Sequence, residues 1–88
     1  MVATQLVWSE QASTVLDLVA PDPRAEIERR LDYLRSMPRM YPIADDVQFP
    51  GCRSFWVEPV YRVFYMVAAA GRDVYVVAIR EEDVGELE

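Results

Sequence analysis

Residues 60–67 read VYRVFYMV, a nearly unbroken apolar run that contains a single charge, Arg62. Valine and aromatic residues are favoured in β-strands, so the run predicts a strand. Because side chains alternate across a strand, one face would carry Tyr61, Val63, Tyr65 and Val67, and the other Arg62, Phe64 and Met66. Both faces are largely apolar. One is therefore expected to pack on helices and the other to be partly covered by something else.

Two further strands are predicted beside this one. CRSFWVE (52–58) precedes it and DVYVVAI (73–79) follows it, and both are rich in valine or aromatic residues. Glu58-Pro59 separates the first pair of strands, and residues 70–72 are a turn candidate between the second pair. Because the connections are short, the three strands are expected to form an antiparallel meander.

The first twenty residues predict a strand and a short helix. VATQLVW (2–8) is apolar and alternates loosely, as a first strand would. Ser9 offers an N-cap oxygen to the helix that follows, and Pro21 is expected to end that helix. The apolar stripe of the helix consists of Ala12, Val15, Leu16 and Val19.

A second helix is predicted from the segment PDPRAEIERRLDYLRSMP. Asp22 is expected to cap it, with Pro23 as its first residue, and Pro38 to end it. Arg24 and Glu28 stand at pairing distance on its surface. Its apolar face would carry Ile27, Leu31 and Leu34, and residues 38–51 are expected to form a long loop.

The predicted order is therefore β-α-α-β-β-β. It indicates an α+β fold with a helical hairpin packed on a curled antiparallel sheet. A single domain is expected over residues 1–80, followed by an acidic C-terminal tail over 81–88.

Composition excludes several classes of site. The chain contains no histidine and no lysine, which removes histidine-based nucleophilic systems, HExxH zinc sites and the P-loop lysine. No GxGxxG motif is present, so neither a cofactor nor a metal is expected. Cys52 is the only cysteine and cannot form an internal disulfide, which fits a reducing compartment. With no membrane-length apolar stretch and no basic leader, the protein is expected to be cytoplasmic.

The net charge of −6 is distributed unevenly. Residues 81–88 hold five acidic side chains and no arginine, which leaves ten acidic residues against nine arginines in the rest of the chain. Between Arg53 and Arg80 four arginines stand against Glu58 and Asp73. The overall acidity argues against general nucleic-acid binding, but a local basic patch is consistent with this distribution.

With these elements in this order, the sequence resembles the RelE/ParE superfamily of type II toxin–antitoxin systems. That family carries a motif YR-φ-φ-Y-φ-φ, where φ is apolar, and YRVFYMV (61–67) matches it. VWSEQA (7–12) looks like the family's strand-to-helix entry, and FPGCRSFWV (49–57) looks like its loop into the second strand. The resemblance covers residues 5–80.

The resemblance implies a small bacterial toxin, of the kind found in plasmid stabilization modules, neutralised by a cognate antitoxin. RelE-type members are mRNA interferases that cleave mRNA on the ribosome with basic and aromatic side chains of the sheet. On this resemblance Arg62 matches the motif arginine, Arg53 a basic position at the start of the preceding strand, and Arg80 the end of the last strand. Arginines at such positions would stabilise the charge that develops on a phosphate.

Departures from the family pattern keep an alternative open. Val57 stands at a basic position of the family, and an acidic segment follows Arg80. The alternative is a non-catalytic member, or one that inhibits DNA gyrase as ParE does, which serves mainly as a protein-binding module. An exposed apolar patch would then bind the antitoxin or a second copy in a homodimer.

The arginines and the tail also have structural interpretations. Arg62 could pack its stem on the sheet while its head meets solvent or a carboxylate of Asp45, Asp46 or the tail. The acidic tail could be a solvated end, or could lie over the arginines in the place of a phosphate.

Overall fold

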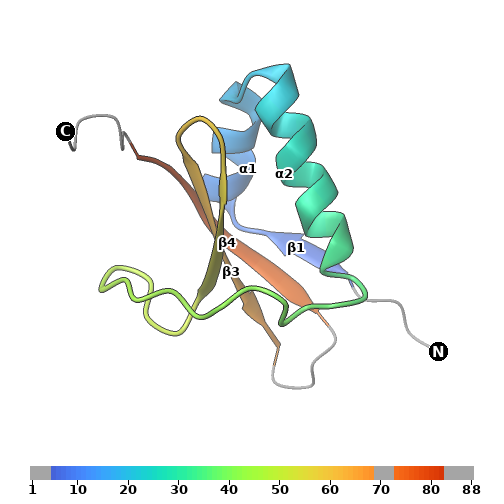
Figure 1. Cartoon of the computed structure of the whole chain (residues 1–88), viewed down its shortest axis with the longest axis vertical. Coiled ribbons are helices and arrows are strands. Elements are labelled where there is room, and N and C mark those ends of the chain that lie inside the picture. The colour runs from blue at the N-terminus through green and yellow to red at the C-terminus, as the bar shows by residue number, and fades with distance from the viewer. Residues whose placement is uncertain (1–4, 69–72, 83–88) are drawn as a thin grey trace.

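A computed structural model describes residues 5–68 and 73–82 and shows two helices packed on one face of a four-stranded sheet (Figure 1). The elements are β1 (Leu6–Trp8), α1 (Glu10–Leu18), α2 (Pro21–Tyr33), β2 (Arg53–Val57), β3 (Tyr61–Val67) and β4 (Val74–Glu81). This order confirms the predicted β-α-α-β-β-β arrangement and the α+β class. None of the helices in these ranges is long and apolar enough to cross a bilayer.

The strands lie in the order β1-β4-β3-β2. Strands β2, β3 and β4 form the antiparallel meander expected from their short connections. Strand β1 adds to the free side of β4 in parallel, with Leu6 beside Val74 and Trp8 beside Val76. The sheet is therefore mixed, and the last strand of the chain lies inside it.

The main core lies between the helices and the sheet. Ser9 caps α1 as expected, because its Oγ accepts a hydrogen bond of 3.0 Å from the Ala12 amide. The apolar stripes of both helices are buried against one face of the strands. The helices contribute Ala12, Leu16, Val19, Ile27, Leu31 and Leu34, and the strands contribute Phe55, Val57, Val63, Tyr65, Val74, Val76 and Ile79.

A second, smaller core covers the opposite face of the sheet. The loop between α2 and β2 folds across that face, as the green segment in Figure 1 shows. Its Ala44 and Phe49 pack with Cys52 against Phe64 and Ala78. The Ala44 amide donates to the Cys52 carbonyl at 2.7 Å, which fixes the loop to the start of β2. The apolar far face expected from VYRVFYMV is thus covered in part by the chain itself.

The start of α2 corrects the prediction. The helix begins at Pro21 with Ala20 as N-cap, two residues before the position expected from Asp22 and Pro23, and it ends at Tyr33. Both prolines fit because the amides of the first helical turn have no partner within the helix. Ala20 is extended, as a residue before proline prefers to be.

Strand β4 also extends further than expected, through Arg80 to Glu81. Glu81, the first residue after the predicted domain boundary at 80, is thus part of the sheet. The turn candidate at 70–72 and residues 83–88 of the tail lie outside the described residues, and the division at residue 80 stays a prediction.

Candidate functional site

A β-bulge places two arginines together on the face of the sheet away from the helices. Val74 and Val76 of β4 face the helices, so strict alternation would turn Arg80 toward them as well. Phe64 pairs with Ala78 but the next residue of β3 pairs with Val76, which leaves Val77 as an extra residue in β4. The extra residue reverses the alternation beyond it, as bulges do. Arg80 therefore lies directly opposite Arg62 on the far face.

Aromatic rings surround the two guanidinium groups. The Arg62 guanidinium lies 5.4 Å from the Trp56 ring centroid and 5.3 Å from that of Phe64. The Arg80 guanidinium lies 4.8 Å from the same Phe64 ring and 5.9 Å from Phe49. Cation–π contacts of this length are attractive. Because Phe64 is fully buried, one fixed ring positions both arginines.

Arg62 has only neutral partners among the residues that the structure describes. Its Nε donates to the Ser54 Oγ at 3.2 Å, and its other contacts are the rings of Trp56 and Phe64. Within residues 5–68 and 73–82 no carboxylate forms an ion pair with it. No carboxylate in these ranges therefore neutralises its charge.

Arg80 is neutralised within the protein. Its Nη2 lies 2.7 Å from the Asp46 Oδ2, and its Nη1 donates to the Gln48 Oε1 at 3.1 Å. Glu82 contacts both its Nε and its Nη2. The Arg80 guanidinium holds the pKa of the Asp46 carboxyl below its usual range, and these carboxylates raise the pKa of Arg80. Asp46, one of the carboxylate partners that the sequence suggested for Arg62 beside Asp45 and the tail, is thus a partner of Arg80.

Arg53 lies apart from this pair. It is the cross-strand neighbour of Tyr65, which faces the helices, and its Nη1 donates to the Tyr41 carbonyl at 2.7 Å. The structure therefore brings together two of the three predicted site arginines, Arg62 and Arg80, and places Arg53 on the other face. Sequence reasoning did not single out Trp56, Ser54, Phe49 or Gln48. Of these, only Trp56 had a signal in the sequence, namely the strand alternation that places it opposite Arg62.

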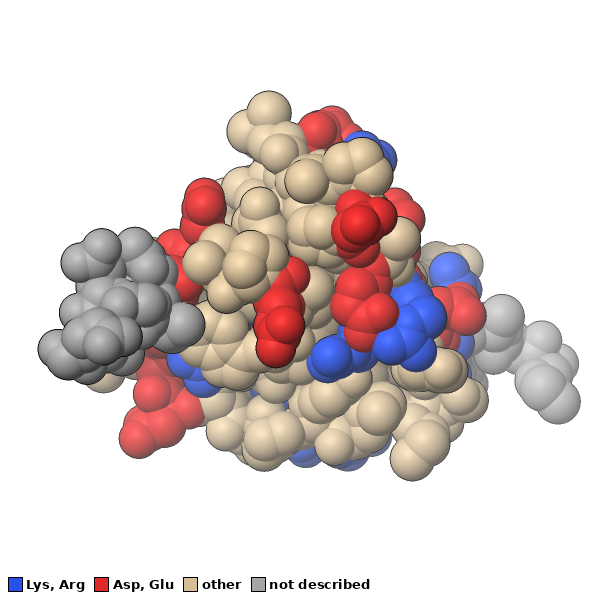
Figure 2. All heavy atoms as spheres, turned by 45° about the horizontal axis from the view of Figure 1, so that its top comes forward, with Lys and Arg blue, Asp and Glu red and all other residues tan. Residues whose placement is uncertain are grey.

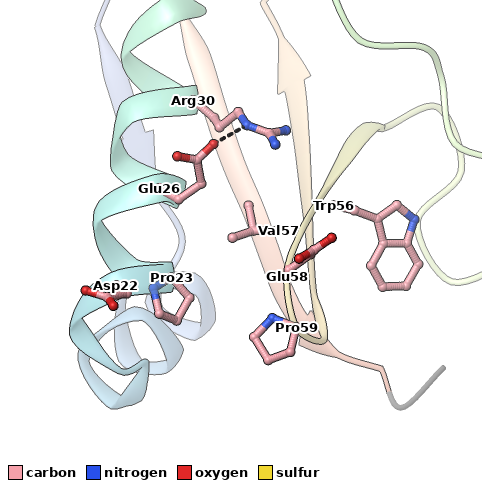
Figure 3. A pocket seen from close by; sticks show the side chains of 8 residues that line it. All are labelled: Asp22, Pro23, Glu26, Arg30, Trp56, Val57, Glu58 and Pro59. Atoms are coloured by element: carbon pink, nitrogen blue, oxygen red, sulfur yellow. Dashed lines mark hydrogen bonds and ion pairs between the residues drawn. The ribbon is translucent and has the colours of Figure 1, made fainter. Parts of the chain in front are cut away.

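A groove of about 660 Å³ lies on the helix side of the sheet, between α2 and the β2–β3 turn. Figure 3 shows Pro23 of α2 facing Pro59 of the turn, with Arg30 and Glu26 projecting from α2 above them, while Trp56 points to the other side of the strands. The groove is lined by Asp22, Pro23, Glu26, Arg30, Trp56, Val57, Glu58 and Pro59.

The charges of this groove do not suit a phosphate. Glu26 accepts hydrogen bonds from Arg29 at 2.6 Å and from Arg30 at 2.7 Å, and these lower the pKa of Glu26 to about 2. Arg30 is thus paired, and Asp22 and Glu58 add further negative charge. Figure 2 shows acidic side chains spread over much of the end of the molecule that lies at the top of Figure 1. Negative charge of this kind disfavours contact with a phosphate backbone.

Groups for other chemistry are scarce in the described part of the chain. No cluster of carboxylate or cysteine side chains there could hold a metal ion. Cys52 is buried, and burial raises the pKa of its thiol, so it is not a reactive nucleophile. What the arginine face can do is bind an anion and hold a flat group on its exposed ring.

Comparison with known proteins places this geometry in a known fold. No protein-family model and no curated protein matches the sequence. Among solved structures, the isolated E. coli RelE toxin superposes with a TM-score of 0.79 at 19% identity, covering 97% of this chain and 90% of RelE. The chain has the RelE/ParE toxin fold.

Two further RelE/ParE structures show the same likeness. The RelBE2 toxin–antitoxin complex of Mycobacterium tuberculosis matches with a TM-score of 0.70 at 18% identity, over 92% of this chain and 100% of that one. The chromosomal ParDE system of P. aeruginosa matches with a TM-score of 0.63 at 17% identity, over 92% and 98%. The resemblance read from YRVFYMV is thus confirmed at the level of the fold.

Proposed function

We propose that this protein is the toxin of a type II toxin–antitoxin module and acts on translation by ribosome-dependent mRNA cleavage in the cytoplasm. The observation that supports RNA as the target is the state of Arg62. Its guanidinium is held between two aromatic rings, has no carboxylate partner among the described residues, and lies beside the partly exposed Trp56. A cation next to an exposed ring is suited to a phosphate and its neighbouring base.

In this mechanism Arg62 stabilises charge. It would contact the scissile phosphate and stabilise the negative charge that develops when the 2′-OH attacks, since its two terminal nitrogens can bind two phosphate oxygens. Among the described residues, the side chains in contact with Arg62 are Ser54, Trp56 and Phe64, none of which is a base. As the 2′-oxygen bonds to phosphorus, the P–O5′ bond would break. The 2′-OH would give its proton to a group that the ribosome or the RNA supplies, and the leaving 5′-oxygen would take a proton from another such group.

A cognate antitoxin is the proposed protein partner. The RelBE structures that share this fold are complexes of a toxin with an antitoxin. The groove between α2 and the β2–β3 turn suits such a partner, because it combines apolar Pro23, Val57 and Pro59 with the acidic Asp22 and Glu58. A basic, partly apolar segment of the antitoxin would complement it in charge.

The test is expression without an antitoxin. Growth should stop, and primer extension should reveal cuts in translated messages. Arg62→Ala should reduce cleavage in a purified ribosome assay by about 100-fold, as removal of one charge-stabilising donor typically does. Arg24→Ala removes an arginine from the surface of α2 and serves as the matched control. Harmless expression of the folded protein would contradict the toxin assignment.

A second candidate function is favoured by the state of Arg80. Because carboxylates of the chain itself occupy this arginine, Arg62 is the one arginine of this face, within residues 5–68 and 73–82, that has no carboxylate partner. That arrangement fits a non-catalytic or gyrase-inhibiting ParE-like member that serves mainly as a protein-binding module. Capture of an antitoxin without RNA cleavage, or block of gyrase supercoiling in vitro, would support it.

A further inference from the structure

Each nitrogen of the Arg80 guanidinium contacts an oxygen of the protein. Asp46 takes one terminal nitrogen, Gln48 takes the other, and Glu82 bridges Nε and the first of these nitrogens. These are the positions that two phosphate oxygens would take in a bidentate contact. The chain therefore supplies its own substitute for an anion at this arginine.

The backbone segments that carry the two carboxylates are fixed independently of Arg80. The Asp46 Oδ1 accepts a hydrogen bond of 2.9 Å from the Gln48 amide, which closes a tight turn in the loop over the sheet. The Glu82 amide donates to the Val60 carbonyl at 2.7 Å. Their side chains are only 13% and 21% exposed. Both are thus presented to Arg80 by fixed backbone rather than by mobile ends.

Comparison with Arg62 indicates that these contacts also change the charge of the arginine face. Arg62 and Arg80 are cross-strand neighbours and share one ring, yet the carboxylates gather on Arg80 alone. Like charges directly opposite one another repel, so the carboxylates offset that repulsion. They also reduce the positive charge of the face that Arg62 offers to an anion.

We propose that Asp46 and Glu82 act as a built-in competitor for RNA phosphate at Arg80. This inference rests on the proposed contact of the Arg62 face with RNA. Binding of RNA across both arginines requires one phosphate oxygen to replace a carboxylate on Arg80. The face therefore binds RNA weakly with Arg62 alone, and more tightly once a carboxylate is removed or drawn away.

The test uses isosteric variants of the full chain and a short fluorescein-labelled single-stranded RNA, followed by anisotropy without ribosomes. Glu82→Gln and Asp46→Asn should each tighten binding by roughly three- to fivefold, the size of a partly exposed ion pair. Each should also steepen the salt dependence by about one phosphate contact. Glu28→Gln is the control, because it removes the same charge from an exposed pair with Arg24 on α2.

The double variant Arg80→Ala/Glu82→Gln separates competition from general electrostatics. If Glu82 acts by masking Arg80, its removal gains nothing once Arg80 is absent. Equal tightening by Glu82→Gln and Glu28→Gln would overturn the inference, as would a gain that persists without Arg80. Lower stability with unchanged RNA binding would also overturn it, because a purely structural role predicts that outcome.

These results are independent of the toxin assignment. RNA anisotropy measures the masking of Arg80 directly, whereas growth arrest and ribosome-dependent cleavage measure the proposed function. Circular dichroism checks that each variant is folded, and the Nε–Hε resonance of Arg80 reports whether its carboxylate contacts are lost. If no variant binds RNA more tightly than Glu28→Gln does, the proposed masking of Arg80 by Asp46 and Glu82 is excluded. That conclusion holds even if expression of the protein arrests growth.

Discussion

Arg62 and Arg80 lie directly opposite each other on β3 and β4, yet one is free of carboxylate partners among the described residues and the other is bound to two. The pair is thus asymmetric: the same residue type, on the same ring of Phe64, has two different electrostatic environments. Because of this asymmetry, the two arginines should respond differently to substitution.

Stability should distinguish the two arginines. Arg80→Ala leaves two largely covered carboxylates without their cation, so it should lower the free energy of unfolding. Arg62→Ala removes one hydrogen bond to Ser54 and ring contacts, and its cost should be smaller. Urea unfolding followed by tryptophan fluorescence measures both. Adding Asp46→Asn to Arg80→Ala should recover part of the loss, and an equal cost for both arginines would contradict the asymmetry.

Tyr65→Phe should stabilise the protein. Tyr65 is fully buried, and its hydroxyl has no hydrogen-bond partner in the described structure, while burial raises its pKa. An unsatisfied buried hydroxyl costs roughly 1–3 kcal/mol, so its removal should raise the free energy of unfolding by about 1 kcal/mol. Tyr75→Phe is the matched control because Tyr75 is exposed. A less stable Tyr65→Phe protein would mean that the hydroxyl is satisfied.

Gln11→Ala should destabilise the sheet edge. The Gln11 amide group donates to the Ile79 carbonyl and accepts from the Ile79 amide, both at 3.1 Å, where β4 extends beyond β1. Loss of both contacts should cost about 1–3 kcal/mol, although alanine is the better helix former. Thr14→Ala on the exposed side of α1 is the control. Thermal unfolding gives both values, and unchanged stability of Gln11→Ala would show that water replaces the amide without cost.

The acid sensitivity of the protein should depend on Glu26. Arg29 and Arg30 lower its pKa from 4.5 to about 2, so the folded state favours the ionised form. Because the unfolded chain takes up this proton near pH 4.5, the stabilisation is complete above that pH and is lost as the pH falls toward 2. The difference in unfolding free energy between wild type and Glu26→Gln should therefore be constant above pH 4.5 and shrink below it. A difference that does not change over this range would exclude the linkage.

The order of elements and the buried faces of the helices could be predicted because the spacing of apolar residues along the sequence indicates both directly. The stripe of Ile27, Leu31 and Leu34 is fully buried, and the alternation of VYRVFYMV divides the two cores as expected. The alternation predicted that Arg62 shares a face with Phe64 and Met66, but not which face the helices cover. These properties depend on residues close together in sequence.

The rest of the site depends on features without a local signal. The extra residue at Val77 has no glycine or proline to mark it, so the sequence gives no sign that Arg80 shares a face with Arg62. The contact of Arg80 with Asp46 joins residues 34 positions apart, and no periodicity relates them. The first turn of α2 was misplaced because Pro21 and Pro23 both suit it.

The position of β4 also determines when the fold can exist. Among the described strands this one comes last in sequence, but it lies between β1 and β3 and carries Arg80. A growing chain cannot pair β1 with β4 or complete the arginine pair until residues 74–81 have emerged, since β1 and β4 are separated by most of the sequence. For a protein proposed to attack translation, such a topology delays assembly of the arginine face until β4 has been synthesised.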